Sequence, residues 1–128
     1  MLKKFSLILL VAFIFAFIFT GCESAKPPVT LSPPTWIQGT WTASETNNTF
    51  ISFVFTYDDV ILVTSLDSYN FKNSLAKITE TATTTNYTLT ALDANNKSTI
   101  YDFLLISDNQ LRFTYTVNAQ STVWNYSK

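Results

Sequence analysis

The sequence predicts an all-β domain over residues 36–128, a small antiparallel up-and-down (meander) β-barrel of about eight strands. From Trp36 to Lys128 there is no proline and one glycine, whereas Thr and aromatic residues, which favour strands, are frequent. Apolar residues recur at every second position between short polar turns, which is the period of a strand. Because the turns are short and sequential, we favour a barrel over a sandwich: closing the last strand on the first would remove both edges of the meander.

Residues 1–21 have the pattern of a secretory signal peptide. Lys3 and Lys4 precede an apolar run over residues 5–19, which only Ser6 interrupts, and a small residue, Gly21, follows. This run is shorter than the roughly 20 apolar residues that a membrane-spanning helix needs. We therefore expect a cleaved signal peptide, with an uncleaved signal anchor as the alternative.

The segment Phe19-Thr20-Gly21-Cys22 resembles the lipobox of bacterial lipoproteins, although Phe19 stands where that family usually has Leu. The resemblance implies cleavage before Cys22, a diacylglycerol on its thiol and a further acyl chain, such as palmitate, on the new N-terminus. Two or more chains anchor a protein durably. Glu23 is compatible with onward transport, so we expect a lipid anchor in the bacterial cell envelope, at the outer membrane. The alternative is an ordinary signal peptide with an incidental cysteine.

Residues 22–35 form the predicted lipidated Cys and linker. All four prolines of the chain lie here, in two pairs. Paired prolines favour an extended polyproline conformation of about 3.1 Å per residue, so this segment would act as a spacer of roughly 40 Å.

The first half of the domain alternates in two strands and then becomes less regular. Ile37, Gly39, Trp41 and Ala43 would share one face of the first strand, and Ile51, Phe53, Phe55 and Tyr57 one face of the second. Asp58 and Asp59 indicate a tight turn. Residues 60–63 are apolar on both faces, and residues 68–74 fit either a helical turn or a short strand.

The second half of the domain alternates more clearly. Residues 78–82 form a weak strand with Glu80 on the inner face, and Tyr87, Leu89 and Ala91 alternate with threonines. After a turn over residues 93–96, Tyr101, Phe103 and Leu105 share one face, and Ile100, Leu104 and Ile106 the other. A turn at Asp108–Asn109 leads to alternation over residues 111–117, and residues 123–126 form the last strand.

Gly39-Thr40-Trp41 resembles the Gly-x-Trp signature of the lipocalin and calycin barrels. The resemblance implies a lipocalin-like barrel in which Trp41 closes the floor beneath a short helical segment, for which residues 31–37 are available. It also implies an arginine packed over that Trp, and Arg112, the sole arginine, corresponds only loosely to this position. The alternative is that Trp41 is an ordinary core residue.

The composition argues against catalysis. The chain has no His, one Cys and two Gly, which excludes a Ser-His-Asp triad, a His-ligated metal site, a Gly-rich phosphate loop and a disulfide within the chain. Asp93 and Asn95 lack the glycine and the closing Glu of a calcium loop, and Glu80 and Asp102 read more simply as solvated or ion-paired carboxylates than as a catalytic pair. We expect no enzyme activity, cofactor or metal. The net charge of −1 without a basic cluster speaks against nucleic-acid binding.

Aromatic residues make up 16% of the chain, and their first interpretation is a core. If the barrel is not filled, a pocket for a small hydrophobic or lipid-like ligand would be lined by Trp41, Phe53, Phe55, Tyr101, Phe103, Phe113 and Tyr115. Two functions follow: a non-enzymatic envelope lipoprotein with a structural, antigenic or protein-contact role, and a lipocalin-like carrier.

Overall fold

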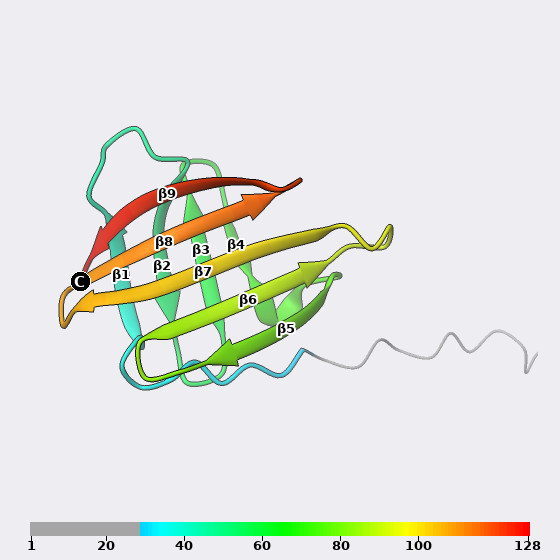
Figure 1. The fold of residues 1–128 in the computed structure, drawn as a ribbon, viewed down its shortest axis with the longest axis horizontal. Coiled ribbons are helices and arrows are strands. Elements are labelled where there is room, and N and C mark those ends of the chain that lie inside the picture. The colour runs from blue at the N-terminus through cyan, green and yellow to red at the C-terminus, as the bar shows by residue number, and fades with distance from the viewer. Residues whose placement is uncertain (1–28) are drawn as a thin grey trace, which may run out of the picture.

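A computed structural model describes residues 29–128 of the protein (Figure 1). Within this range the chain forms nine strands and one short 3₁₀-helix, η1 (Phe71–Asn73). The strands are β1 (Gly39–Ala43), β2 (Phe50–Phe55), β3 (Val60–Thr64), β4 (Ser68–Asn70), β5 (Lys77–Ala82), β6 (Asn86–Leu92), β7 (Ser98–Ser107), β8 (Gln110–Val117) and β9 (Gln120–Ser127).

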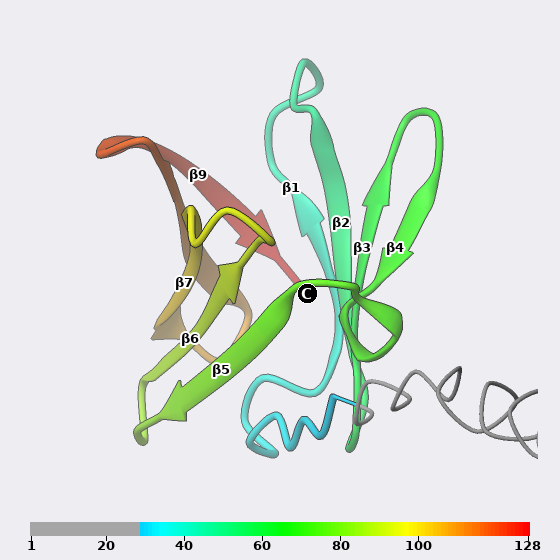
Figure 2. The same ribbon diagram turned by 90° about the vertical axis from the view of Figure 1, so that its right-hand side faces the viewer.

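All nine strands belong to one antiparallel sheet in the order β4-β3-β2-β1-β9-β8-β7-β6-β5. The predicted all-β, up-and-down meander is therefore confirmed, and the last strand does pair with the first. The expectation that this pairing removes both edges is wrong, because the sheet ends at β4 and β5, which do not pair with each other. Figure 2 shows the result, a curled half-barrel whose two halves diverge like the arms of a V.

An aromatic side chain links the β4 end of the sheet to β7 in the other half. Residues 68–74, which fitted either a short strand or a helical turn, form both: the three-residue strand β4 is followed directly by η1. The first residue of η1, Phe71, is buried, and its ring centroid lies 5.2 Å from that of Tyr69 on β4 and 4.9 Å from that of Tyr101 on β7. The Phe71 ring thus lies between β4 and β7.

Asp59 holds η1 against the start of β3. Its carboxylate is buried and accepts hydrogen bonds from the backbone N–H of Val60 (2.8 Å) and of Lys72 (2.9 Å) and from the Asn70 amide (3.1 Å). The neighbouring Asp58 lies at the surface and forms an ion pair with Lys72. The predicted turn at these two aspartates is present, closed by the hydrogen bond from Thr56 N to Asp59 O.

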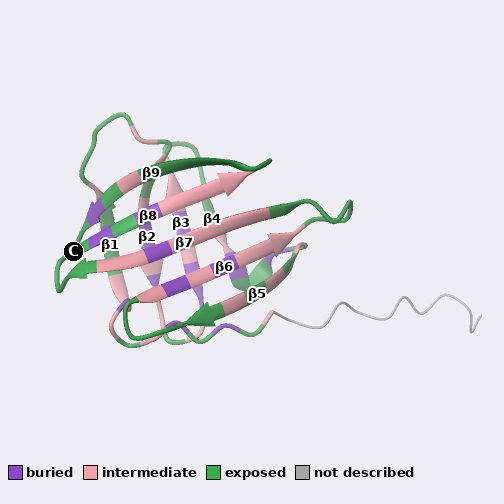
Figure 3. Ribbon diagram, viewed as in Figure 1, coloured by how far each residue is buried: buried purple, intermediate pink, exposed green. Residues whose placement is uncertain are grey.

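The core lies on the concave face of the sheet, and the buried positions along the strands follow the predicted alternation (Figure 3). The second strand departs from the prediction, because a register shift between Phe50 and Ser52 turns Phe50 inward and leaves Ile51 exposed. Tyr57 lies in the following turn and is 76% exposed. The prediction that Ile51 and Tyr57 share one face with Phe53 and Phe55 is therefore wrong, because alternation cannot reveal a bulge or the last residue of a strand.

The segment before β1 packs against the half-barrel. Leu31 and Ile37 are buried in the core, and Ile37 closes a hydrogen-bonded turn with Pro34 instead of a helix. The Trp36 indole donates to Thr83 O at 3.0 Å, beside the edge strand β5. The predicted linker therefore includes residues that cover the sheet.

We expect Asp59→Ala to lower the free energy of unfolding by about 2 kcal/mol, because three donors near the core lose their acceptor. Urea unfolding followed by tryptophan fluorescence measures this change. Asp58→Ala is the matched control and should have a smaller effect, because it removes a surface ion pair with Lys72 and one hydrogen bond from the Thr56 hydroxyl. Equal effects of the two substitutions would contradict the anchoring role of Asp59.

Candidate functional site

The Gly39-Thr40-Trp41 segment forms one end of the aromatic interior. The Trp41 ring is fully buried, and its indole N–H donates to Ile37 O at 2.7 Å. Lys128 Nζ lies 5.2 Å from the centroid of this ring and donates to Gln38 O at 2.7 Å. Gly39 has φ +122°, and a Cβ there would lie 2.8 Å from Lys128 Cε. The glycine is thus required by its backbone conformation, whereas the flexible end of the Lys128 side chain could move away from a Cβ.

The cation over Trp41 is therefore Lys128 and not Arg112, the arginine that the resemblance to lipocalins suggested. Arg112 alternates outward on β8 between the buried residues Leu111 and Phe113, so its side chain is on the convex face. A lysine at the end of the last strand was not singled out in the sequence, because nothing in its local pattern brings it back over β1.

The seven predicted lining residues all lie on the concave face, and most of them contact one another. Trp41, Phe53, Phe55, Phe103 and Phe113 are buried, with exposures of 0–2%. Ring centroids are separated by 4.7 Å for Phe53–Phe113, 4.9 Å for Phe53–Phe103 and 4.9 Å for Phe103–Phe113. The structure thus brings the predicted residues together as a packed aromatic core.

Tyr101 and Tyr115 are only partly buried and lie towards the wide, open end of the half-barrel. Their centroids are 5.4 Å apart, and Tyr115 contacts Phe50 at 5.1 Å. Phe50 also contacts Trp124 at 5.4 Å. These four residues, Phe50, Tyr101, Tyr115 and Trp124, form a group that we call the mouth cluster. Phe50 and Trp124 were not predicted as lining residues, because the bulge in β2 and the register of β9 place them inward.

Glu80 connects the segment before β1 to the interior. Its carboxylate accepts from Ser32 N (2.9 Å), from the Ser32 hydroxyl (3.0 Å) and from the Tyr87 hydroxyl (2.6 Å). Asp102 belongs to another group and accepts from Thr88 and Asn86. The ladders place Glu80 opposite Leu89 and Asp102 opposite Thr88, so the two carboxylates lie on opposite faces of the sheet and form no catalytic pair.

Three tyrosines of the interior resist ionisation. Burial raises the pKa of Tyr87, Tyr101 and Tyr126 well above the ordinary value of 10, and the hydrogen bond to Glu80 raises that of Tyr87 further. The Tyr126 hydroxyl donates to Phe50 O at 2.5 Å and accepts from the Asn48 amide at 3.2 Å. All three hydroxyls therefore keep their protons near neutral pH, and those of Tyr87 and Tyr126 act as hydrogen-bond donors.

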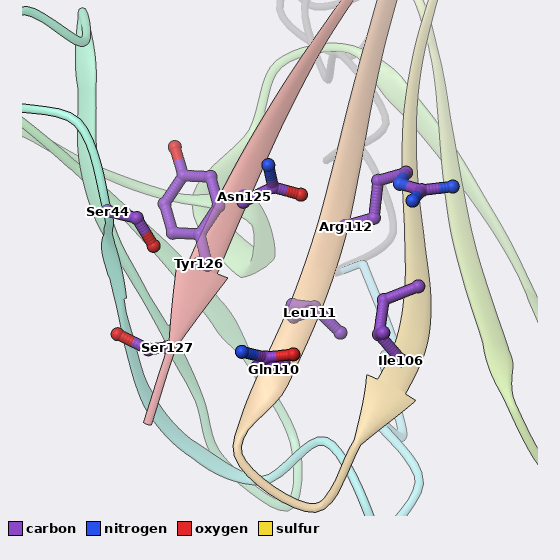
Figure 4. A pocket seen from close by; sticks show the side chains of 8 residues that line it. All are labelled: Ser44, Ile106, Gln110, Leu111, Arg112, Asn125, Tyr126 and Ser127. Atoms are coloured by element: carbon purple, nitrogen blue, oxygen red, sulfur yellow. The ribbon is translucent and has the colours of Figure 1, made fainter.

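A shallow hollow of about 420 Å³ lies around Arg112 (Figure 4). Arg112 and Asn125 are cross-strand neighbours, and so are Gln110 and Ser127. The hollow is lined by Ser44, Ile106, Gln110, Leu111, Arg112, Asn125, Tyr126 and Ser127, without an acidic residue among them. Arg112 is the charged side chain of this lining, and Gln110 and Asn125 can donate further hydrogen bonds, so chemically the hollow suits a carboxylate or another small anion.

The predicted lipidation residue Cys22 lies outside the described residues, and its lipidation stays a prediction. Over residues 29–128 no helix is long and apolar enough to span a membrane. The same part of the chain contains no group of three or more acidic, His or Cys side chains that could hold a metal ion.

Comparison of the chain with models of known protein families, with curated proteins and with solved structures found no match. The half-barrel is compatible with a calycin-like fold.

We expect the free energy of unfolding to fall as the pH rises above about 10. Buried tyrosines keep their protons in the folded state, whereas an unfolded tyrosine loses its proton near pH 10, so ionisation favours the unfolded chain. Urea unfolding at pH values from 8 to 12 measures this fall. Tyr101→Phe should reduce the slope above pH 10, whereas Tyr57→Phe, at an exposed position, should leave it unchanged. Equal slopes for both variants and the wild type would contradict this assignment.

Proposed function

We propose that the protein is a membrane-anchored bacterial envelope lipoprotein without enzymatic activity, whose half-barrel acts through structural or protein contacts. The observation that carries this proposal is the packed interior. The rings that would line a ligand pocket contact one another at 4.7–4.9 Å, so they occupy the space that a carried molecule would need.

The anchor part of the proposal rests on the sequence. Residues 19–22 resemble a lipobox, and Cys22 is the only cysteine of the chain. Six residues separate Cys22 from Val29, where the described chain starts to pack against the half-barrel. An extended linker of that length would hold the domain roughly 20 Å from the lipid, close to the membrane surface of the envelope.

The alternative function is a carrier of a small hydrophobic or lipid-like ligand. The mouth cluster supports it, because Phe50, Tyr101, Tyr115 and Trp124 continue the aromatic core towards the open end and remain partly exposed there. A ligand would then sit on these rings and not inside a closed cavity.

We expect Cys22→Ser to abolish lipid attachment and signal cleavage before residue 22. Metabolic labelling with a fatty acid, followed by fractionation of envelopes, measures both effects. The unsubstituted chain should incorporate label and sediment with the outer membrane, whereas the variant should remain unlabelled. A Ser24→Ala variant, which changes a linker hydroxyl, is the control. A variant that matures and stays in the membrane like the unsubstituted chain would contradict the lipobox interpretation.

We expect no lipid-like molecule to accompany the 29–128 fragment in native mass spectrometry, because its core is filled. This fragment contains the whole described core. A fluorescent fatty-acid analogue tests binding at the mouth cluster: a carrier should bind it and lose at least fivefold in affinity in Tyr115→Ala, but not in Tyr57→Ala. That result would favour the carrier, and absence of binding in all three proteins would favour contact with proteins.

A further inference from the structure

The edge of β9 that faces β1 is unpaired over most of its length. β9 has eight residues, but β1 pairs with it only at Tyr126 and Ser127. One further hydrogen bond, from Ser44 N to Asn125 O (2.9 Å), follows before the chain leaves the sheet. In the described part of the protein no strand pairs with residues 120–124 on this side, and Figure 1 shows this half of β9 at the border of the sheet.

The free main-chain groups on this edge belong to Ser121 and Val123. Asn125 O points towards β1, because it accepts from Ser44 N. Alternate residues of a strand direct their N–H and C=O to the same side, so Ser121 and Val123 direct theirs to this side as well. Both residues are exposed, Val123 by 53%. An added antiparallel strand could therefore form a pair of main-chain hydrogen bonds with each of these two residues.

The other edges of the sheet are protected and that of β9 is not. The edge strand β5 carries Lys77 and Glu80, and Glu80 is bound to Ser32. The edge strand β4 has only three residues. Charges and short strands are devices that prevent edge-to-edge pairing. The sequence of β9, Gln-Ser-Thr-Val-Trp-Asn-Tyr-Ser, contains neither a charge nor a proline.

We propose that two copies of the protein associate through this edge, with β9 of one copy antiparallel to β9 of the other in one continuous sheet. A strand that fits this edge needs a free edge of its own and no charged side chain. It also needs two residues, two positions apart, whose main-chain N–H and C=O groups point to that edge. β9 of a second copy meets all three requirements, so the edge is complementary to itself. The proposal rests on the protein-contact role above and names a partner for it.

The structure also selects the register of this pairing. Centring the two-fold axis on Thr122 places Ser121 opposite Val123 of the other copy, which joins the free main-chain groups in four hydrogen bonds. Centring it on Val123 would place Ser121 opposite Asn125, whose carbonyl already accepts from Ser44 N. Centring it on Ser121 would require Ala119, which has φ +61° and lies in the β8–β9 turn. The axis at Thr122 is the one that uses only free groups.

In this register the two Thr122 residues form a non-hydrogen-bonded pair, whose Cα atoms lie about 4.5 Å apart in antiparallel sheets. This separation falls within the range of disulfides. We therefore expect Thr122→Cys in the full chain, within membranes of expressing cells, to form a disulfide-linked dimer on mild oxidation. The unsubstituted chain, which carries Cys22 alone, gives the background.

Val123→Cys is the matched control, because its two copies would be offset along the strands and should cross-link at least fivefold less. No dimer from Thr122→Cys above the background, or equal yields from both variants, would overturn the proposal. A second test needs no added cysteine: Val123→Pro removes an N–H on the free side without affecting the β8 ladder. Chemical cross-linking of the full chain in membranes should capture the dimer for Val123→Thr but not for Val123→Pro, and capture from both would also overturn the proposal.

These results separate the dimer from the wider function. If Thr122→Cys does not cross-link but the 29–128 fragment carries no ligand, the contact role stands with a different partner. If the fragment binds the fatty-acid analogue through Tyr115, the proposed function fails whatever the state of β9.

Discussion

The edge-to-face packing of aromatic rings across the concave face holds the two halves of the sheet together. The ladder between β1 and β9, which joins the halves, contains only two residue pairs. Phe53 on β2 compensates for this short ladder, because its ring contacts Phe103 on β7 and Phe113 on β8. Each such pair contributes about 1 kcal/mol beyond the burial of its apolar area. The angle between the halves therefore depends on how these rings pack.

The same packing explains why the barrel is open and why its interior is filled. A closed barrel needs backbone pairing at every strand, but β4 and β5 do not pair with each other, and the Phe71 ring instead contacts Tyr69 on β4 and Tyr101 on β7. Asp59 fixes η1, and with it Phe71, in this position. With its interior filled by side chains, the domain presents to other molecules its convex face, its mouth cluster and its strand edges.

Most of one side of the β9 main chain is left unpaired at the surface of the described domain because β1 is short, although the inward side chains of β9 belong to the core. Because β1 ends at Ala43 and β9 begins at Gln120, the longer strand extends beyond its partner. The β8–β9 turn, with positive φ at Asn118 and Ala119, fixes the register in which Trp124 and Tyr126 point inward. The inward side chains of β9 thus complete the core, while its main chain remains available on the other side.

The sequence by itself determined the strand-rich domain, most of its alternation and the seven aromatic residues that come together inside, because period-two patterning follows directly from strand geometry. It also carries the lipobox-like segment at Cys22, which depends on local spacing alone. Only the tertiary structure decided that Phe50 replaces Ile51 inside, that Lys128 and not Arg112 lies over Trp41, and that the sheet stays open between β4 and β5. Bulges, contacts between chain ends and the meeting of distant edges arise from packing between residues far apart in the chain, and no local pattern records them.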